Sequence, residues 1–290
     1  MKIALHILLA LIALAGNSIL CRLALGEDAI DAASFTSIRL LSGIIVLVII
    51  MMATQSKSGI ITKGSWKASI MLFLYAITFS YAYISLETGV GALILFGSVQ
   101  ITMIVAGLLL GNRLHQFEWL GVIVAFSGFV YLVMPGVTAP SFIGFILMAI
   151  AGIAWGGYTL VGKGSVNPLC DTTFNFVRTL PLLVILIAVT FEQSVLSQKG
   201  IILAILSGGV TSGIGYTIWY TVLRELTAIQ AAVIQLLVPV LAAFGGVLFV
   251  GEVFTFRLVV SSIMILLGVL AVILGRYYLE KNLEKNLDKG

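Results

Sequence analysis

Long runs of hydrophobic residues, separated by short polar segments, extend along this chain from its beginning to about residue 275. A helix that crosses the hydrocarbon layer of a membrane needs about 20 mainly apolar residues. The short connections predict that consecutive helices pack antiparallel. We predict ten membrane-spanning helices, at residues 3–21, 33–53, 67–85, 90–110, 117–134, 141–160, 173–191, 201–221, 229–250 and 257–275.

The pattern of hydrophobic runs occurs twice. Residues 89–133 resemble residues 229–273 at an offset of about 140 residues, and a repeat of this length marks a duplicated structural unit. We therefore predict a first repeat of five helices at residues 1–137 and a second at residues 138–275. A cytoplasmic tail at residues 276–290 follows the second repeat.

Each predicted repeat carries an F-x-x-x-R pair in its second helix, Phe35 with Arg39 and Phe174 with Arg178. Because five is an odd number, the second repeat must enter the membrane from the opposite side to the first. The sequence thus predicts an all-α membrane protein whose ten transmembrane helices form two inverted five-helix repeats. This arrangement is typical of secondary transporters, which bind their substrate near the membrane midplane between the repeats.

The composition excludes a water-soluble globular protein, since 60% of the residues are hydrophobic, 10% are charged and the mean hydropathy is +1.17. The net charge of +4 does not indicate a nucleic-acid partner, because no basic motif is present. Arg22, Lys199 and Arg257 fall in predicted outer loops, and Arg39 and Arg178 fall within spans. All other lysines and arginines fall on the opposite side, which predicts a multi-pass protein of the inner (plasma) membrane with both termini in the cytoplasm.

A cleavable signal peptide is the alternative interpretation of the first helix. Lys2, the apolar run 3–14 and the small-residue site 13–15 match that pattern. The repeat favours a retained helix, because residues 3–25 correspond to residues 143–165 and cleavage would leave the first repeat one helix short.

The paired units resemble the EamA branch of the drug/metabolite transporter superfamily over nearly the whole chain. Gly16 and Gly156 lie near the end of the first helix of each unit, beside the two F-x-x-x-R pairs. Residues 251–254 keep the G-E-x-x turn and Pro239 the mid-helix proline, whereas residues 111–114 read G-N-R-L. The resemblance implies a carrier for amino acids, other metabolites or drugs.

Polar and aromatic side chains inside the predicted spans are the candidates for a substrate site. A polar side chain in a membrane costs free energy unless it faces protein or water, and clustered aromatic rings suit a cavity for an amphipathic ligand. An interfacial aromatic belt is the alternative for the aromatic residues. We expect the substrate to contact Asn17, Arg39, Tyr75, Gln100, Trp155, Tyr158, Asn175, Arg178 and Gln235.

Two interpretations of Arg39 and Arg178 stay open. Each lies about 10 Å deep in its predicted helix, on opposite sides of the midplane, at ~1.5 Å per residue. They are either structural arginines that bind carbonyls near helix ends, or mirrored gate charges that meet a substrate carboxylate in turn.

Several chemistries are not supported by the sequence. No carboxylate lies in the middle of a predicted span, so coupling to protons has no evident residue. Residues 157–164 nearly match a phosphate-binding loop, but Gly164 replaces the required hydroxyl residue. The scattered histidines, Cys21 and Cys170 make no metal site, and no catalytic motif indicates an intramembrane enzyme.

We therefore predict a secondary transporter with a small-molecule substrate, no cofactor and the lipid bilayer as its surroundings. It would export amino acids, related amphipathic metabolites or drugs by alternating access through a central cavity between the repeats. A non-transporting membrane scaffold or assembly factor is the alternative, and the sequence predicts no oligomeric state.

Overall fold

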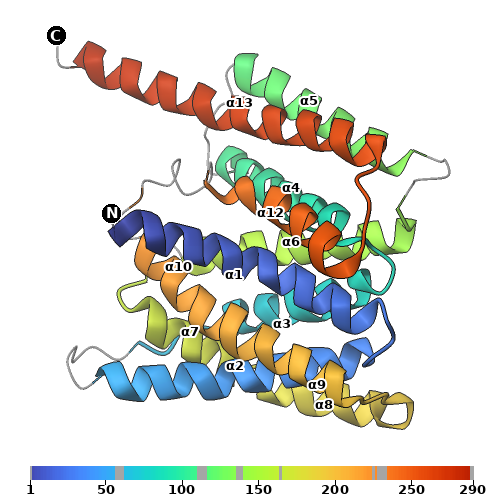
Figure 1. The fold of residues 1–290 in the computed structure, drawn as a ribbon. Helices are drawn as coiled ribbons and strands as arrows, with labels where there is room; N and C mark the ends of the chain where they lie inside the picture. The colour runs from blue at the N-terminus through green and yellow to red at the C-terminus, as the bar shows by residue number, and fades with distance from the viewer. Residues whose placement is uncertain are drawn as a thin grey trace.

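The structure is a computed structural model that describes residues 2–55, 62–109, 116–134, 140–162, 165–223, 226 and 234–287. Helices form nearly all of the described chain (Figure 1). The first part contains α1 (Lys2–Leu25), α2 (Ala32–Gln55), α3 (Trp66–Tyr83), α4 (Thr88–Leu109) and α5 (Gln116–Val133). The second part contains α6 (Phe142–Gly162), α7 (Pro168–Val177), α8 (Leu180–Thr190), η1 (Phe191–Gln193), α9 (Gln198–Ile205), η2 (Leu206–Ile214), α10 (Gly215–Leu223), α12 (Leu237–Gly245), η3 (Gly246–Val250) and α13 (Phe256–Leu287).

The predicted hydrophobic runs coincide with these helices, but three runs are not uniform α-helices. In the run 229–250, α12 continues into the π-helix η3. The run 173–191 is divided into α7 and α8, because Pro181 lacks an N–H and its ring would clash with the carbonyl of Val177. The run 201–221 is helical throughout, but its middle, η2, is a nine-residue π-helix. The predicted turn at 111–114, residues 163–164 and the start of the run 229–250 lie outside the described residues.

Among the described residues, seven helices are long and apolar enough to cross a membrane. They are α1, α2, α4, α6, α13, the α7–α8 run and the run from α9 into α10. Shorter apolar helices occur at Glu118–Leu132 and Leu237–Val250, and α3 is outside both groups. The chain is thus an all-helical, multi-pass membrane protein, and the arrangement as ten spans in two repeats stays a prediction.

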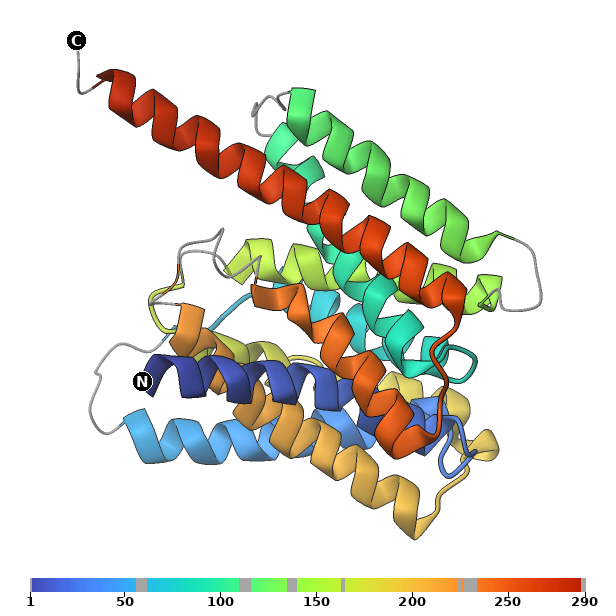
Figure 2. The same cartoon turned by 45° about the horizontal axis from the view of Figure 1, so that its top comes forward.

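The helices pack in a reciprocal pattern. Helix α6 packs against α3 and α4 of the first part. Helix α1 packs against α9, η2, α10 and α12 of the second part, and α4 also packs against α12. Helices α5 and α13 form a separate pair along one side of the molecule (Figures 1 and 2). In this pair, a Cβ on Gly128 would lie 2.8 Å from Ile265, and a Cβ on Gly268 would lie 2.5 Å from the backbone of Ala125. Gly128 and Gly268 lie 140 positions apart, and so do Ala125 and Ile265. The two contacts are therefore equivalent under the predicted repeat.

The described connections gather at two ends of the bundle. At one end, which we call the Asp31 end, Asp31 and Val195 join the connection before α2 to the connection before α9. At the other end, the Asp171 end, Gly64 in the connection before α3 meets Asp171 in α7. Segments 62–65 and 194–197 therefore lie at opposite ends of α2.

Helix α2 approaches η2 very closely. A Cβ on Gly208 would overlap the carbonyl oxygen of Arg39, and a Cβ on Gly43 would lie 2.9 Å from the ring of Phe176 and 3.3 Å from the carbonyl oxygen of Gly208. Small residues allow two helix backbones to meet in this way inside a membrane, where packing rather than the hydrophobic effect holds helices together. This contact places the hydroxyl residues of η2 directly beside α2.

We expect Gly208→Ala to destabilise the protein, because the new methyl group would push against backbone rather than against a flexible side chain. Overpacking of this kind costs about 1–3 kcal/mol. Gly162→Ala is the matched control, since nothing lies within 4 Å of a Cβ at Gly162. Thermal unfolding in detergent should show a lower Tm for Gly208→Ala alone, and equal Tm values for the two variants would contradict the close contact.

Candidate functional site

Arg39 lies in the interior of the helix bundle, about two turns into α2. Only 2% of its surface is exposed. Its Nη2 donates a hydrogen bond to the hydroxyl of Tyr75 at 3.0 Å, and its Nε donates to Ser212 Oγ at 3.4 Å. Its Nη1 is buried and has no hydrogen-bond partner. The guanidinium group therefore has spare donor capacity in the interior of the protein.

The positive charge of Arg39 is not balanced by a carboxylate in the part of the chain that the structure describes. The ion pairs there join Arg22 to Glu252 and Lys199 to Glu27. Two aromatic rings give partial compensation, since the guanidinium carbon lies 5.3 Å from the ring centre of Tyr75 and 4.9 Å from that of Phe79. An arginine at the centre of a membrane helix costs about 2.5–3.5 kcal/mol on insertion scales, so a net cost is expected to remain.

Asn17 and Tyr75 connect Arg39 to three helical segments. The amide nitrogen of Asn17 in α1 donates to the hydroxyl of Tyr75 in α3 at 3.2 Å. The amide oxygen of Asn17 accepts hydrogen bonds from Ser207 at 2.6 Å and from Thr211 at 3.3 Å, both in η2. The hydroxyl of Tyr75 thus accepts from Asn17 and from Arg39, which uses both of its lone pairs. This network fixes the position of the guanidinium group.

An aromatic wall adjoins this network. The ring centre of Trp155 in α6 lies 4.8 Å from that of Tyr75, 5.5 Å from that of Tyr158 and 5.0 Å from that of Tyr216. The four rings are at most 5% exposed, so they do not form an interfacial belt. Arg39 and its hydroxyl partners lie against one edge of this wall.

The structure brings five of the nine predicted site residues together and places two others, Asn175 and Arg178, at the Asp171 end. There, Asn175 Oδ1 accepts a hydrogen bond from the backbone of Ser65 at 2.9 Å and Arg178 donates to the carbonyl of Lys63. Gln100 in α4 and Gln235 before α12 are buried, at 3% and 8% exposure. The residues that gather around the guanidinium group are Asn17, Arg39, Tyr75, Trp155 and Tyr158.

The η2 residues of this cluster and Tyr216 are additional to the nine residues expected from the sequence. The signal available in the sequence was the Ser/Thr/Gly-rich stretch 207–213 within a hydrophobic run. Its glycines indicate helix packing, and Gly209 and Gly213 do face Val46 of α2. The hydroxyl residues of the same stretch contact Asn17 and Arg39, and π-helical segments are frequent at functional sites.

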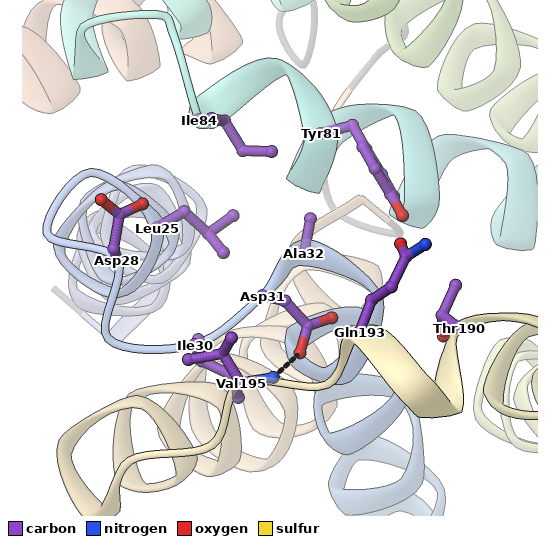
Figure 3. A pocket seen from close by; sticks show the side chains of 10 residues that line it. All are labelled: Leu25, Asp28, Ile30, Asp31, Ala32, Tyr81, Ile84, Thr190, Gln193 and Val195. Atoms are coloured by element: carbon purple, nitrogen blue, oxygen red, sulfur yellow. Dashed lines mark hydrogen bonds between the residues drawn. The ribbon is translucent and has the colours of Figure 1, made fainter.

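A cavity of about 370 Å³ opens at the Asp31 end (Figure 3). Tyr81, Gln193 and Asp31 extend their polar groups into it, and Asp31 Oδ2 accepts a hydrogen bond from the backbone of Val195 at 2.9 Å. Arg39 follows Asp31 by eight residues, which is about 12 Å along α2. The cavity is lined by Leu25, Asp28, Ile30, Asp31, Ala32, Tyr81, Ile84, Thr190, Gln193 and Val195.

Asp31 is one of the two aspartates that line this cavity. Partial burial acts to raise the pKa of its carboxyl group, but hydrogen bonds from Ser34, Val195 and Ala33 outweigh burial and lower the pKa below its usual value. The carboxylate is therefore ionised at neutral pH. No group of His, Cys, Asp or Glu side chains suited to a metal ion occurs among the described residues.

Comparisons with known proteins identify the family. Residues 142–274 match the model of the EamA-like transporter family. An uncharacterized protein of Pseudomonas aeruginosa is 44% identical over 268 residues, which cover 92% of this chain and 93% of that protein. An uncharacterized transporter of Archaeoglobus fulgidus is 26% identical over 211 residues, which cover 70% of this chain and 74% of the relative.

Solved structures share the fold. One of them superposes with a TM-score of 0.60 at 17% identity and covers 91% of this chain and 97% of its own. The chain belongs to the EamA-like transporter family, which confirms the resemblance drawn from the sequence.

We expect Tyr75→Phe to destabilise the protein, because it leaves donors of Arg39 and Asn17 buried without their acceptor. Such a loss costs about 1–3 kcal/mol. Tyr131→Phe, on a half-buried ring of α5, is the control. Thermal unfolding should show a clear fall in Tm for Tyr75→Phe, whereas equal Tm values for both variants would contradict the network.

Proposed function

We propose that this protein is a secondary transporter whose substrate carries an anionic group, such as a carboxylate, that binds Arg39 during transport. The observation that carries the proposal is the buried Nη1 of Arg39, which lacks a partner in a site without a balancing carboxylate among the described residues. A carboxylate would supply charge-assisted hydrogen bonds and neutralise the guanidinium group. A structural arginine would instead be expected to use all of its donors on carbonyl groups.

The aromatic wall supports a further feature of the substrate. Ligand sites combine apolar and aromatic lining with a few polar groups that fix orientation. Trp155, Tyr158 and Tyr216 offer the apolar surface, while Arg39 and Asn17 offer the polar groups. Amino acids and related amphipathic metabolites have both parts, and drugs with an acidic group would also fit this description.

Alternating access is the proposed mechanism, with residues 1–137 and 138–275 as two inverted five-helix repeats. The reciprocal packing of α3 on α6 and of α1 on α9 and α10 supports this arrangement. The equivalent contacts of Gly128 with Ile265 and of Gly268 with Ala125 also support it. In proteins built this way, one repeat rocks against the other around a site near the midplane. Arg39 would then be reached from one side of the membrane at a time.

The proposed direction is export across the inner membrane, with both termini in the cytoplasm. The distribution of lysine and arginine supports the orientation, and the direction follows from the family resemblance. Arg178 binds the carbonyl of Lys63 and lies 5.8 Å from the ring of Trp66. This environment favours the structural interpretation for Arg178 and leaves Arg39 as the substrate-binding arginine.

Flux measurements with purified protein in liposomes test the proposal. We expect Arg39→Gln to reduce transport of anionic and zwitterionic substrates by at least about tenfold, the effect of losing one hydrogen bond to a charged group. Neutral substrates should be transported at nearly unchanged rates, and Arg39→Lys should keep part of the activity. Arg178→Gln is the matched control with the same change of charge at the Asp171 end.

Two results would contradict the proposal. Equal loss for all substrates, together with a lower Tm, would make Arg39 a structural residue. Absence of flux for every compound in a broad panel, with the wild-type protein folded in the membrane, would favour the scaffold or assembly factor.

A further inference from the structure

A carboxylate ties the two proposed repeats together at the Asp31 end. Asp31 Oδ2 accepts a hydrogen bond from the backbone N–H of Val195 at 2.9 Å, and the N–H of Asp31 donates to the carbonyl of Val195 at 3.1 Å. The N–H of Ser197 donates to the carbonyl of Ala29 at 3.1 Å beside them. The start of α2 is therefore joined to the segment that precedes α9, next to the cavity in Figure 3.

A second carboxylate makes the equivalent tie at the Asp171 end. Asp171 Oδ1 accepts a hydrogen bond from the N–H of Gly64 at 2.8 Å, and Asn175 Oδ1 accepts one from Ser65 at 2.9 Å. Here the start of α7 is joined to the segment that precedes α3. The two ties use corresponding elements: each joins the helix with an F-x-x-x-R pair to the segment before the third helix of the other repeat.

Both ties involve short helices that end at an irregularity. Helix α7 is separated from α8 by the turn at 178–179, and α9 continues into the π-helix η2, which contains Gly208, Gly209 and Gly213. Helices bend at breaks and at π-helical segments. Hinges of this kind absorb the change in backbone dihedral angles when a site opens. Each tied segment can thus swing without moving the rest of its helix.

We propose that Asp31 and Asp171 are two latches that close the opposite ends of the transport path, and that each opens in turn. The inference rests on the proposed alternating access. With both latches closed, as in this structure, Arg39 is only 2% exposed. A latch made of hydrogen bonds between a side chain and backbone can exchange its partners for water, and the cavity beside Asp31 brings water to that latch. Release of the Asp31 latch opens the path from the cavity towards Arg39.

Cys21 provides a built-in reporter for this opening. Its thiol is fully buried beside Arg39 and Ser80. The chain contains two cysteines, so Cys170→Ala leaves Cys21 as the single thiol. Modification of Cys21 by a membrane-impermeant maleimide, added to right-side-out or inside-out vesicles, measures how often each end opens.

The substitution at each latch is chosen to leave the local helix start intact. Asp31 also accepts a hydrogen bond from the N–H of Ser34, as an N-cap. Asp31→Asn keeps an oxygen for this cap, but turns its NH2 group towards the N–H of Val195, where it cannot bond. Asp171→Ala removes the second latch and leaves Asn167, the N-cap of α7, in place.

We expect Asp31→Asn to raise the rate of Cys21 modification from one face by about tenfold, the change expected for one hydrogen bond to a charged group. Asp171→Ala should raise it from the opposite face by a similar factor. Glu27→Gln is the matched control, because the exposed pair of Glu27 with Lys199 also crosses between the repeats at the Asp31 end and should contribute little.

Each latch has a second variant. Val195→Pro removes the N–H that donates to Asp31, and Asn175→Ala removes the acceptor of the Ser65 N–H beside Asp171. The proposal is overturned if the latch variants label from the same face, if their rates equal that of Glu27→Gln, or if neither variant of a latch folds. The assay needs no substrate. Normal flux of the wild type with unchanged labelling of the variants would reject the latches alone, whereas face-specific labelling without any flux would reject the transport function alone.

Discussion

A positive charge held inside a membrane protein, with no balancing carboxylate among the described residues, is the constraint on which this structure depends. Arg39 is buried among α1, α3 and η2, and the described residues around it offer hydroxyl groups and aromatic rings in place of an anion. Hydroxyl groups and ring faces stabilise a guanidinium group less than a carboxylate does. The proposed binding of an anionic substrate rests on this difference, because a carboxylate of the protein beside Arg39 would already have neutralised the guanidinium group.

The backbone geometry around Arg39 depends on small residues. Gly208 lets η2 lie directly against the backbone of α2, and this approach brings Ser212 to the guanidinium group and Ser207 to Asn17. A larger residue at Gly208 would separate these partners. The same glycine-rich segment is a π-helix, and π-bulges are among the places where helices bend.

Much of the fold could be predicted from the sequence, because a membrane-spanning helix needs a long apolar run and such runs are plain in this chain. The division of α7 from α8 also has a local cause in Pro181. Asn17, Arg39, Tyr75, Trp155 and Tyr158, which gather around the guanidinium group, could be selected from the sequence because a polar or aromatic side chain within such a run is conspicuous. Their role in binding a substrate stays a prediction.

The remaining site residues carried no comparable signal. Serine and threonine in a helix can satisfy their hydroxyl groups on the preceding turn, as Thr211 does with the carbonyl of Ser207 at 2.7 Å, so their presence in a run does not reveal their partners. The matching positions of Arg39 and Arg178 in the two predicted repeats suggest equivalent roles. The α-helix ends just before Arg178, however, and its side chain turns to the carbonyl of Lys63.

A structure of the protein with a transported substrate bound tests the central claim most directly. The account predicts that the anionic group of the substrate lies within hydrogen-bond distance of Arg39 Nη1, with the apolar part of the substrate against Trp155. A substrate bound elsewhere, with Arg39 Nη1 still unpaired and its contacts to Tyr75 and Ser212 unchanged, would contradict it.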